Sequence, residues 1–318
     1  MYPLKLISPL KDYIWGGTKL KTEFNINTDK EIVAESWELS CHKDGESIIE
    51  NGEYAGLTLS DYINKEGLNV IGTNFNGEKS FPILIKLIDA KDNLSLQVHP
   101  DDSYAQKNED EPGKTEMWYI LDCEDGAEII YGFKKNISKE EFVKRINDGT
   151  ILDVVNRVAV KKGDVFFINS GTLHAIGKGI VIFEIQQNSN ITYRVNDYNR
   201  KGADGNFRPL HINKATDVTD LNKATVYPTS DFNKHEGYSA KSLSACKYFM
   251  ASLYKVDSQV TLIADKKSFH SVVMIDGNAQ LKYNDSILIL SKGDSIYVPA
   301  NFGEYCVSGK CEFILSQI

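Results

Sequence analysis

Four side chains of the sequence have the chemistry of metal ligands. Gln97 and His99 stand two positions apart in the stretch NLSLQVHPDD, residues 93–102. Glu116 and His174 follow further along the chain. Neutral imidazole, carboxylate and amide carbonyl oxygen are good ligands for Zn²⁺. A site made of these four residues would keep a coordination position open, as catalytic sites require.

The spacing of the first two residues predicts that they share one face of a β-strand. Alternate side chains of a strand point the same way, so Gln97 and His99 lie together, and Leu94, Leu96 and Val98 lie on the other, apolar face. Taken alone, a solvent-exposed polar face would be the ordinary interpretation of such a pair. Further residues of the same chemistry make the metal-site interpretation stronger.

Two of these further residues also stand at alternate positions. Lys114 and Glu116 begin the apolar stretch KTEMWYIL and therefore share a face of that predicted strand. His174 follows the tight turn NSGTL, residues 169–173. The four ligands would thus come from three neighbouring strands of a barrel.

The remaining sequence consists mostly of short apolar segments separated by Gly, Asn and Asp turns, which is typical of an all-β barrel or sandwich. The strands expected are FPILIKLID, EMWYIL, EIIYGF, GDVFFI, GIVIFEIQ, HSVVMID, SILIL and GDSIYVPA. Helices are expected over residues 59–68, after Thr58 or Ser60, and over 138–149, where Ser138 begins a capping-box spacing. Residues 100–115 are polar and rich in turn-forming types.

A weak internal repeat indicates two copies of one β-barrel unit. GDVFFINSGTLHAIG begins at Gly163, and GDSIYVPANFGEYCV begins at Gly293. Each copy has Gly-Asp, a short β-prone run, a turn and another strand. We place the boundary near residues 227–237, which divides the chain into a catalytic part, 1–232, and a C-terminal part, 233–318.

Composition limits the classes of function. The chain has 318 residues and a formal net charge of −8, which argues against general nucleic-acid binding. No apolar run approaches the roughly 18–20 residues that span a membrane, and no export signal is recognisable. The five scattered cysteines suggest neither a disulfide framework nor a thiolate zinc site. We therefore expect a cytoplasmic protein, and an anionic small-molecule partner remains compatible with local Lys and Arg.

The order of the candidate ligands is similar to that of the cupins, a β-barrel family. Its members place two ligands on one strand, a carboxylate on a following strand, and a histidine after a Gly-Asp-strand-turn segment. The chain departs from the usual pattern at Gln97, where histidine is common, and at Asn169, where proline is common. In the second copy Gly303 stands in place of His174. The resemblance implies an all-β-dominated fold of two cupin-type, jelly-roll barrels with a few inserted helices, and a C-terminal barrel without metal.

Longer stretches carry a more specific resemblance. They are FPILIKLIDAKDNLSLQVHPDD, GKTEMWYIL, GTLHAIGKGIVIFEIQQNSNITYRVNDYNR, YIWGG and AESWELSCH. Together they resemble type I mannose-6-phosphate isomerases in the short form of Gram-positive bacteria, over nearly the whole chain. The resemblance implies one Zn²⁺ per chain and interconversion of D-mannose 6-phosphate and D-fructose 6-phosphate through an enediolate.

The same resemblance implies roles for individual residues. Zinc would be held by Gln97, His99, Glu116 and His174; Arg194 and Lys114 would be catalytic; Trp15, Glu35, Lys86 and Arg200 would bind substrate. Larger members follow their arginine with a Gly-Leu-Thr-Pro-Lys-like stretch where this chain has VNDYNR, and Arg200 is the candidate to replace that lysine. Independently of the resemblance, Lys86 lies inside an apolar strand, and a buried lysine needs a charged partner or an anion.

Several questions stay open on the sequence alone. The base that moves the proton could be a pocket carboxylate, a lysine or a metal-bound water, with Lys114 and Glu35 as candidates. The alternatives to the isomerase are another metal-dependent cupin enzyme, such as an iron or manganese oxygenase, and a non-catalytic sugar-binding cupin. The expected partner is a small sugar phosphate, and the chain is expected to be a monomer or homodimer.

Overall fold

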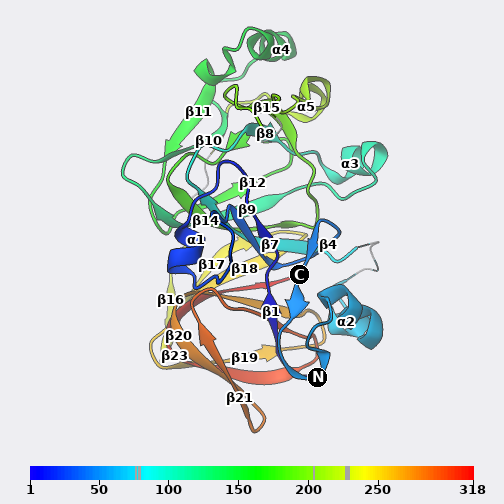
Figure 1. Ribbon diagram of the computed structural model, residues 1–318, viewed down its shortest axis with the longest axis vertical. Helices are drawn as coiled ribbons and strands as arrows, with labels where there is room; N and C mark the ends of the chain where they lie inside the picture. The colour runs from blue at the N-terminus through cyan, green and yellow to red at the C-terminus, as the bar shows by residue number, and fades with distance from the viewer. Residues whose placement is uncertain (76, 78–79, 203–204, 226–229) are drawn as a thin grey trace.

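The computed structural model describes residues 1–318 apart from 76, 78–79, 203–204 and 226–229. Antiparallel β-strands predominate, as predicted, and short helices lie around them (Figure 1). The C-terminal strands occupy the lower part of the view in Figure 1, and helices α4 and α5 lie at the opposite, upper end. The candidate ligands come from the sheets between these two ends.

The candidate ligands lie on or next to strands of two sheets. The six-stranded sheet has the order β12 (Val165–Ile168), β9 (Glu116–Cys123), β14 (Ile180–Gln187), β7 (Ile83–Ala90), β3 (Glu35–Leu39) and β2 (Leu10–Lys11). The five-stranded sheet has the order β11 (Val155–Ala159), β10 (Glu128–Phe133), β13 (His174–Ala175), β8 (Leu96–Val98) and β15 (Tyr193–Asn196).

The third large sheet comes mainly from the C-terminal part. Its central order is β16 (Asn233–His235), β17 (Tyr238–Ala245), β18 (Met250–Val256), β23 (Gly303–Gln317), β20 (His270–Tyr283), β22 (Ser295–Val298), β1 (Leu4–Ile7) and β6 (Ile48–Ile49). In addition, β19 (Gln259–Ala264) pairs with β23, and β21 (Ser286–Ser291) pairs with β20. A short hairpin joins β4 (Cys41–His42) to β5 (Gly45–Glu46).

The helices of the described residues are short. They are α1 (Lys19–Glu23), α2 (Leu59–Glu66), α3 (Asp102–Asn108), α4 (Lys139–Asn147) and α5 (Ile212–Val218), with 3₁₀ turns η1 (Gly52–Tyr54), η2 (Leu68–Val70) and η3 (Ile151–Asp153). Among the described residues, no helix is long and apolar enough to cross a membrane.

The six-stranded sheet is buried on both faces, which explains the nearly continuous apolar runs of its strands. Every residue of β7 and β14 is buried. On β7, Ile85 and Leu87 pack in a cluster that also contains Phe249 and Ile314 of the C-terminal sheet. On the same strand, Ile88 packs in a second cluster that also contains Tyr131 of the five-stranded sheet. The side chains that face the five-stranded sheet therefore lie in a closed interior.

The helices begin where local sequence signals predict. Thr58 caps α2 in a reciprocal capping box with Asp61, and the Ser138 side chain accepts a hydrogen bond from the Glu141 N–H at the start of α4. Within the polar stretch 100–115, expected to be rich in turns, the structure forms α3. Asp101 caps this helix by accepting from the Tyr104 N–H.

Strand β8 is shorter than the predicted alternation. Leu96 and Val98 share an apolar cluster with helix residues, as expected, but Leu94 packs in a different cluster with Trp15 and Ile88. The prediction that Leu94, Leu96 and Val98 share one face was therefore wrong for Leu94. Alternation holds only within a continuous extended strand, and β8 begins at Leu96.

The internal repeat is visible as two turns with the same hydrogen bonds. The Asp164 carboxylate accepts from the Lys161 N–H at 2.9 Å, and the Asp294 carboxylate accepts from the Ser291 N–H at 2.7 Å. The glycine before each aspartate donates to a strand of its own sheet: Gly163 to Ile120 and Gly293 to Met274. The turns of the two copies are thus equivalent. That each copy forms a complete barrel stays a prediction.

The predicted division at residue 232 also stays a prediction. Residues 227–229 of the proposed boundary 227–237 lie outside the described part of the chain. Strand β1 pairs with β22, so the N-terminal residues complete the sheet that the C-terminal part builds.

The two turn glycines offer a matched test of packing. Gly163 and Gly293 have φ values of +93° and +95°, but a Cβ at Gly163 would have no neighbour within 4 Å, whereas one at Gly293 would overlap with the carbonyl oxygen of Phe24. We expect Gly163→Ala to lower the free energy of unfolding by about 1 kcal/mol, because a residue with a Cβ is disfavoured at this positive φ. Gly293→Ala should lower the free energy of unfolding by about 1–3 kcal/mol more, because its Cβ also overlaps with Phe24. Urea unfolding measures both, and equal losses would contradict this account.

Candidate active site

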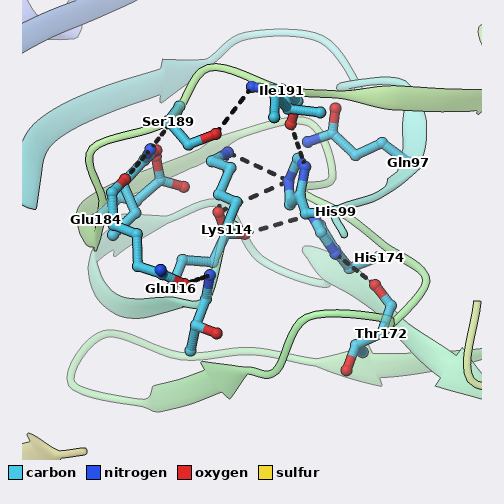
Figure 2. A network of polar contacts seen from close by, with 12 residues as sticks. Gln97, His99, Lys114, Glu116, Thr172, His174, Glu184, Ser189 and Ile191 are labelled. Carbon is cyan, nitrogen blue, oxygen red and sulfur yellow. Dashed lines mark hydrogen bonds and ion pairs between the residues drawn. The ribbon is translucent and has the colours of Figure 1, made fainter. Parts of the chain in front are cut away.

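Three of the predicted metal ligands converge in the interior between the two central sheets. His99 directly follows β8, Glu116 begins β9 and His174 begins β13. One ligand atom from each lies within 4.8 Å of the others, and all three residues are buried. Figure 2 shows the two imidazoles next to one another, with Lys114 and Glu116 beside them. This part of the sequence prediction agrees with the geometry.

Backbone carbonyls fix the orientation of both imidazoles. The Nδ1 of His99 lies 2.7 Å from the carbonyl oxygen of Ile191, and that of His174 lies 2.8 Å from the carbonyl oxygen of Thr172. Because a carbonyl only accepts, each Nδ1 carries the proton and each Nε2 presents a lone pair. Burial lowers the pKa of His99 well below its ordinary value and that of His174 to about 4. Both rings are therefore neutral at pH 7, the form that binds a metal.

The lone pairs of these rings face a carboxylate. The Nε2 of His174 lies 3.3 Å from Oε1 of Glu116, and the Nε2 of His99 lies 3.7 Å from Oε2. Neither the His174 Nε2 nor the Glu116 Oε1 has a hydrogen-bond donor. Buried acceptors that face one another without a donor are unfavourable unless a cation lies between them. The residues therefore fit a divalent metal ion.

Lys114 supplies a positive charge to this cluster. Its Nζ lies 3.0 Å from Oε2 of Glu116 and 3.2 Å from Nε2 of His99. Burial raises the pKa of Glu116, and the Lys114 ammonium partly opposes this rise. The Lys114 ammonium thus lies among groups that are suited to bind a metal ion.

Gln97 lies beside the cluster because of strand pairing. Its Cα is directly opposite that of His174 on β13 and, on the other side, that of Arg194 on β15. The Ser95 hydroxyl donates a hydrogen bond of 3.4 Å to the side-chain oxygen Oε1 of Gln97. The fourth predicted ligand and the predicted catalytic arginine are therefore neighbours across the five-stranded sheet.

A cavity of about 310 Å³ adjoins the cluster through Gln97 and Lys114. Its lining residues are Tyr13, Trp15, Glu35, Lys86, Ile88, Leu94, Ser95, Gln97, Lys114, Ile176, Glu184, Asn190, Thr192, Arg194 and Arg208. A larger cavity of about 710 Å³ lies against His42 and Tyr248, and none of the predicted site residues lines it. The smaller cavity is therefore the candidate substrate site.

Lys86 forms the buried ion-pair network that its place in an apolar strand predicts. Its Nζ lies 3.3 Å from Glu184 and 3.7 Å from Glu35. The indole N–H of Trp37 donates to the same Glu35 oxygen, Oε2, at 2.7 Å, and that of Trp118 donates to the other Glu184 oxygen, Oε2, at 2.9 Å. Burial works against the Lys86 charge, but the two carboxylates outweigh it and raise its pKa.

The carboxylate of Glu184 is ionised within the same network. Burial alone would raise its pKa, but Lys86 and Lys114 outweigh the burial and lower it. The structure places Glu184 in the cavity wall. Trp15 is buried in an apolar cluster and also lines the cavity.

Of the arginines near the site, Arg194 and Arg208 line the cavity, whereas Arg200 does not. Arg200 is held by Asp197, with its Nη2 2.6 Å from Oδ1, and by the carbonyl oxygen of Asn93. The predicted role of Arg200 in substrate binding stays a prediction, and Arg208 is a cavity residue that the sequence analysis did not name. Sequence reasoning missed this residue because nothing local distinguishes it from an ordinary loop charge.

Comparison with known families adds independent evidence. Residues 3–127 match the family described as phosphomannose isomerase type I, catalytic domain. Residues 239–318 match the family described as mannose-6-phosphate isomerase, cupin domain. The second match confirms the predicted cupin character of the fold.

Individual relatives cover the whole chain. The chain is 37% identical over 317 residues to the mannose-6-phosphate isomerase ManA of Bacillus subtilis, covering 99% of each protein. It is 37% identical over 316 residues to a mannose-6-phosphate isomerase of Streptococcus mutans, covering 99% of this chain and 98% of the relative. A crystal structure of the mannose 6-phosphate isomerase from Bacillus subtilis superposes with a TM-score of 0.93 at 38% identity, over 100% of both chains.

Metal content tests the cluster directly. We expect the purified protein to contain one divalent ion per chain, and His174→Ala or Glu116→Gln to retain at most about a tenth of it because each removes a ligand. Elemental analysis by mass spectrometry provides the measurement. His270→Ala is the matched control, since this buried histidine bonds Tyr305 at 2.8 Å, outside the cluster. Equal metal content in all variants would refute the assignment.

Proposed function

The chain belongs to the type I mannose-6-phosphate isomerases, and on this premise we propose that it interconverts D-mannose 6-phosphate and D-fructose 6-phosphate with one zinc ion per chain. The observation that carries the proposal is the convergence of His99, Glu116 and His174, in which the His174 Nε2 and the Glu116 Oε1 have no protein donor, beside a cavity lined by lysines and arginines. Gln97 is the proposed fourth ligand. The donor set suits zinc, and the chemistry that the ion supplies when bound is Lewis-acid polarisation of the sugar carbonyl oxygen.

The reaction moves a proton between C1 and C2 of the sugar, and negative charge develops on the neighbouring oxygens as the enediolate forms. Arg194 is suited to stabilise this charge, because it lines the cavity beside Gln97 and a guanidinium stays protonated throughout the neutral range. We propose Arg194 as a catalytic residue for this reason.

Lys114 and Glu35 are the proposed candidates for moving the proton. Both line the cavity, and Lys114 also contacts two of the ligand residues. His99 and Glu116, which would hold the metal ion, are also the groups that the Lys114 Nζ contacts. Were they to hold the ion, the Lys114 Nζ would lose these acceptors, and we propose that it would then contact the substrate.

Lys86, Glu35 and Trp15 are the proposed binding residues for the sugar. Lys86 and Glu35 present a donor and an acceptor in fixed positions, because their ion-pair network holds them. Trp15 gives the cavity an apolar wall. Fixed polar groups of this kind orient the reacting carbons.

The other finer assignments belong to the same proposal. Residues 1–232 are the proposed catalytic part, because the cluster of His99, Glu116 and His174 lies there, and residues 233–318 are proposed as a part without metal. The five cysteines are free, which suits a cytoplasmic location. We propose a monomer or homodimer.

Isomerase activity tests the proposal as a whole. We expect purified protein to convert mannose 6-phosphate to fructose 6-phosphate in a coupled assay, to lose activity after treatment with a chelator, and to regain it with zinc. Full turnover by metal-free protein would reject the zinc assignment. Ligand binding without turnover would favour the non-catalytic sugar-binding cupin, and oxygen consumption would favour a metal-dependent oxygenase.

Substitution of Arg194 separates catalysis from metal binding. We expect Arg194→Ala to lower kcat about 10²–10³-fold, as loss of a single electrostatic donor does in other enzymes, while metal content stays at the wild-type level. Arg194→Lys keeps a positive charge but not the guanidinium geometry, so its kcat should lie between those of wild type and Arg194→Ala. A kcat within about twofold of wild type for Arg194→Ala would contradict the proposed role.

A further inference from the structure

We propose that Gln187 is a positioning residue for Lys114, and that Tyr248 of the C-terminal part supports it through Asp102. Together these side chains hold the short segment 113–115, which leads into strand β9. The inference rests on the proposed function, because it is there that Lys114 acts on the substrate. It gives the C-terminal part, which supplies no predicted site residue, a share in the geometry of the active site.

Lys114 differs from its neighbour Glu116 in how its backbone is held. Glu116 lies in β9, where its Cα pairs with Gln186 of β14 on one side and with Ile168 of β12 on the other. Lys114 precedes the strand, and its N–H donates to the carbonyl oxygen of Pro100 at 3.0 Å. The position of the Lys114 side chain therefore depends on what fixes the backbone on either side of it.

Gln187 binds both polar backbone groups of Thr115, the residue that follows Lys114. The backbone N–H of Gln187 donates to the carbonyl oxygen of Thr115 at 3.1 Å, and its side-chain Oε1 accepts from the Thr115 N–H at 2.9 Å. Both residues are buried, and a buried backbone N–H needs an acceptor. Regular pairing between β9 and β14 ends at Gln186, so the Gln187 side chain supplies the acceptor that the strand does not.

Asp102 fixes the orientation of the Gln187 amide. Its Oδ1 accepts from Nε2 of Gln187 at 2.7 Å and from the Gly113 N–H at 3.0 Å. Because a carboxylate only accepts, Nε2 must face it, and Oε1 is left to face Thr115. A Cβ at Gly113 would lie 2.5 Å from the backbone nitrogen of Asp102, so this close approach requires glycine. Asp102 therefore holds the backbone before Lys114, as Gln187 holds the backbone after it.

The network joins two segments whose side chains meet at the metal cluster. His99 lies three positions before Asp102, and Lys114 lies one position after Gly113. The Nζ of Lys114 is 3.2 Å from Nε2 of His99. A shift of one segment against the other would move Nζ relative to the cluster and to a substrate beside it. Reaction rates fall steeply when a catalytic group is misplaced by as little as about 1 Å.

Tyr248 connects this network to the C-terminal part. It lies between β17 and β18, and its hydroxyl donates to Oδ2 of Asp102 at 2.6 Å. Burial alone would raise the pKa of Asp102, but the hydrogen bonds that the carboxylate accepts outweigh burial and lower the pKa. One oxygen of the ionised carboxylate thus binds the C-terminal part, and the other binds the backbone next to Lys114.

Steady-state kinetics with a metal count test the positioning role. We expect Gln187→Met to lower kcat about 10- to 100-fold and Tyr248→Phe about 3- to 10-fold. KM should stay within about threefold of wild type, because the sugar-binding residues are outside the network, and metal content should be unchanged. Tyr104→Phe is the matched control: it removes another tyrosine–carboxylate bond from α3, to Asp217 at 3.1 Å, and its kcat should stay within about twofold of wild type.

A second substitution at Lys114 separates positioning from a general loss of structure. If Gln187 acts through Lys114, Gln187→Met should lower the kcat of the Lys114→Met protein by less than about twofold. A loss as large as the one in the wild-type background would overturn the inference. A wild-type kcat for Gln187→Met alone would also overturn it.

Hydrogen exchange tests the network without an activity assay. We expect the backbone amides of residues 113–117 to exchange at least about threefold faster in Gln187→Met than in wild type, and at the wild-type rate in Tyr104→Phe. Unchanged exchange in Gln187→Met would overturn the inference even in an active enzyme. A wild-type chain without isomerase activity would instead overturn the proposed function, and the exchange rates would then decide whether Gln187 holds this segment.

Discussion

The structure depends on an arrangement that is unfavourable without a cation. Two imidazole lone pairs and a carboxylate meet in a buried interior, where no protein donor satisfies the Glu116 Oε1 and the His174 Nε2. In such a place the repulsion between acceptors is not screened, and the desolvation cost of the carboxylate is high. Backbone carbonyls keep both rings from turning their protonated nitrogens toward the carboxylate. These carbonyl contacts make the site unfavourable without a cation, but they also orient both Nε2 lone pairs for binding a metal ion.

The layers of the fold explain how the protein tolerates this unfavourable cluster. The six-stranded sheet packs against the C-terminal sheet on one face and against the five-stranded sheet on the other, so its strands are stabilised by apolar contacts on both sides. Charged residues such as Lys86 and Glu184 occupy only a few positions of these strands and neutralise one another. Strands therefore hold the charged cavity residues Glu35, Lys86, Glu184 and Arg194. Arg208 instead lies outside the strands and is aligned by Asp197.

Much of this arrangement was predictable from local patterns. The apolar strands, the caps at Thr58 and Ser138, and the donor chemistry of His99, Glu116 and His174 are all properties of short stretches. The exceptions have physical causes. Leu94 does not lie on the predicted face because the extended strand begins after it. Helix α3 forms in a polar stretch because Asp101 caps its first turn. Arg200 and Arg208 are alike in local sequence, and only the folded structure shows that Arg208, not Arg200, lines the cavity.

The sequence by itself determined which residues have the chemistry to bind a metal and a sugar phosphate, and which segments form strands. Side-chain type and alternation are local properties, so no knowledge of the fold is needed to recognise them. Only the tertiary structure decided which of these residues meet. Convergence of His99, Glu116 and His174 depends on strand register between distant segments, and the pairing of Arg208 with Asp197 depends on the path of one loop. Such contacts are set by packing across the whole molecule, which is why the local sequence does not specify them.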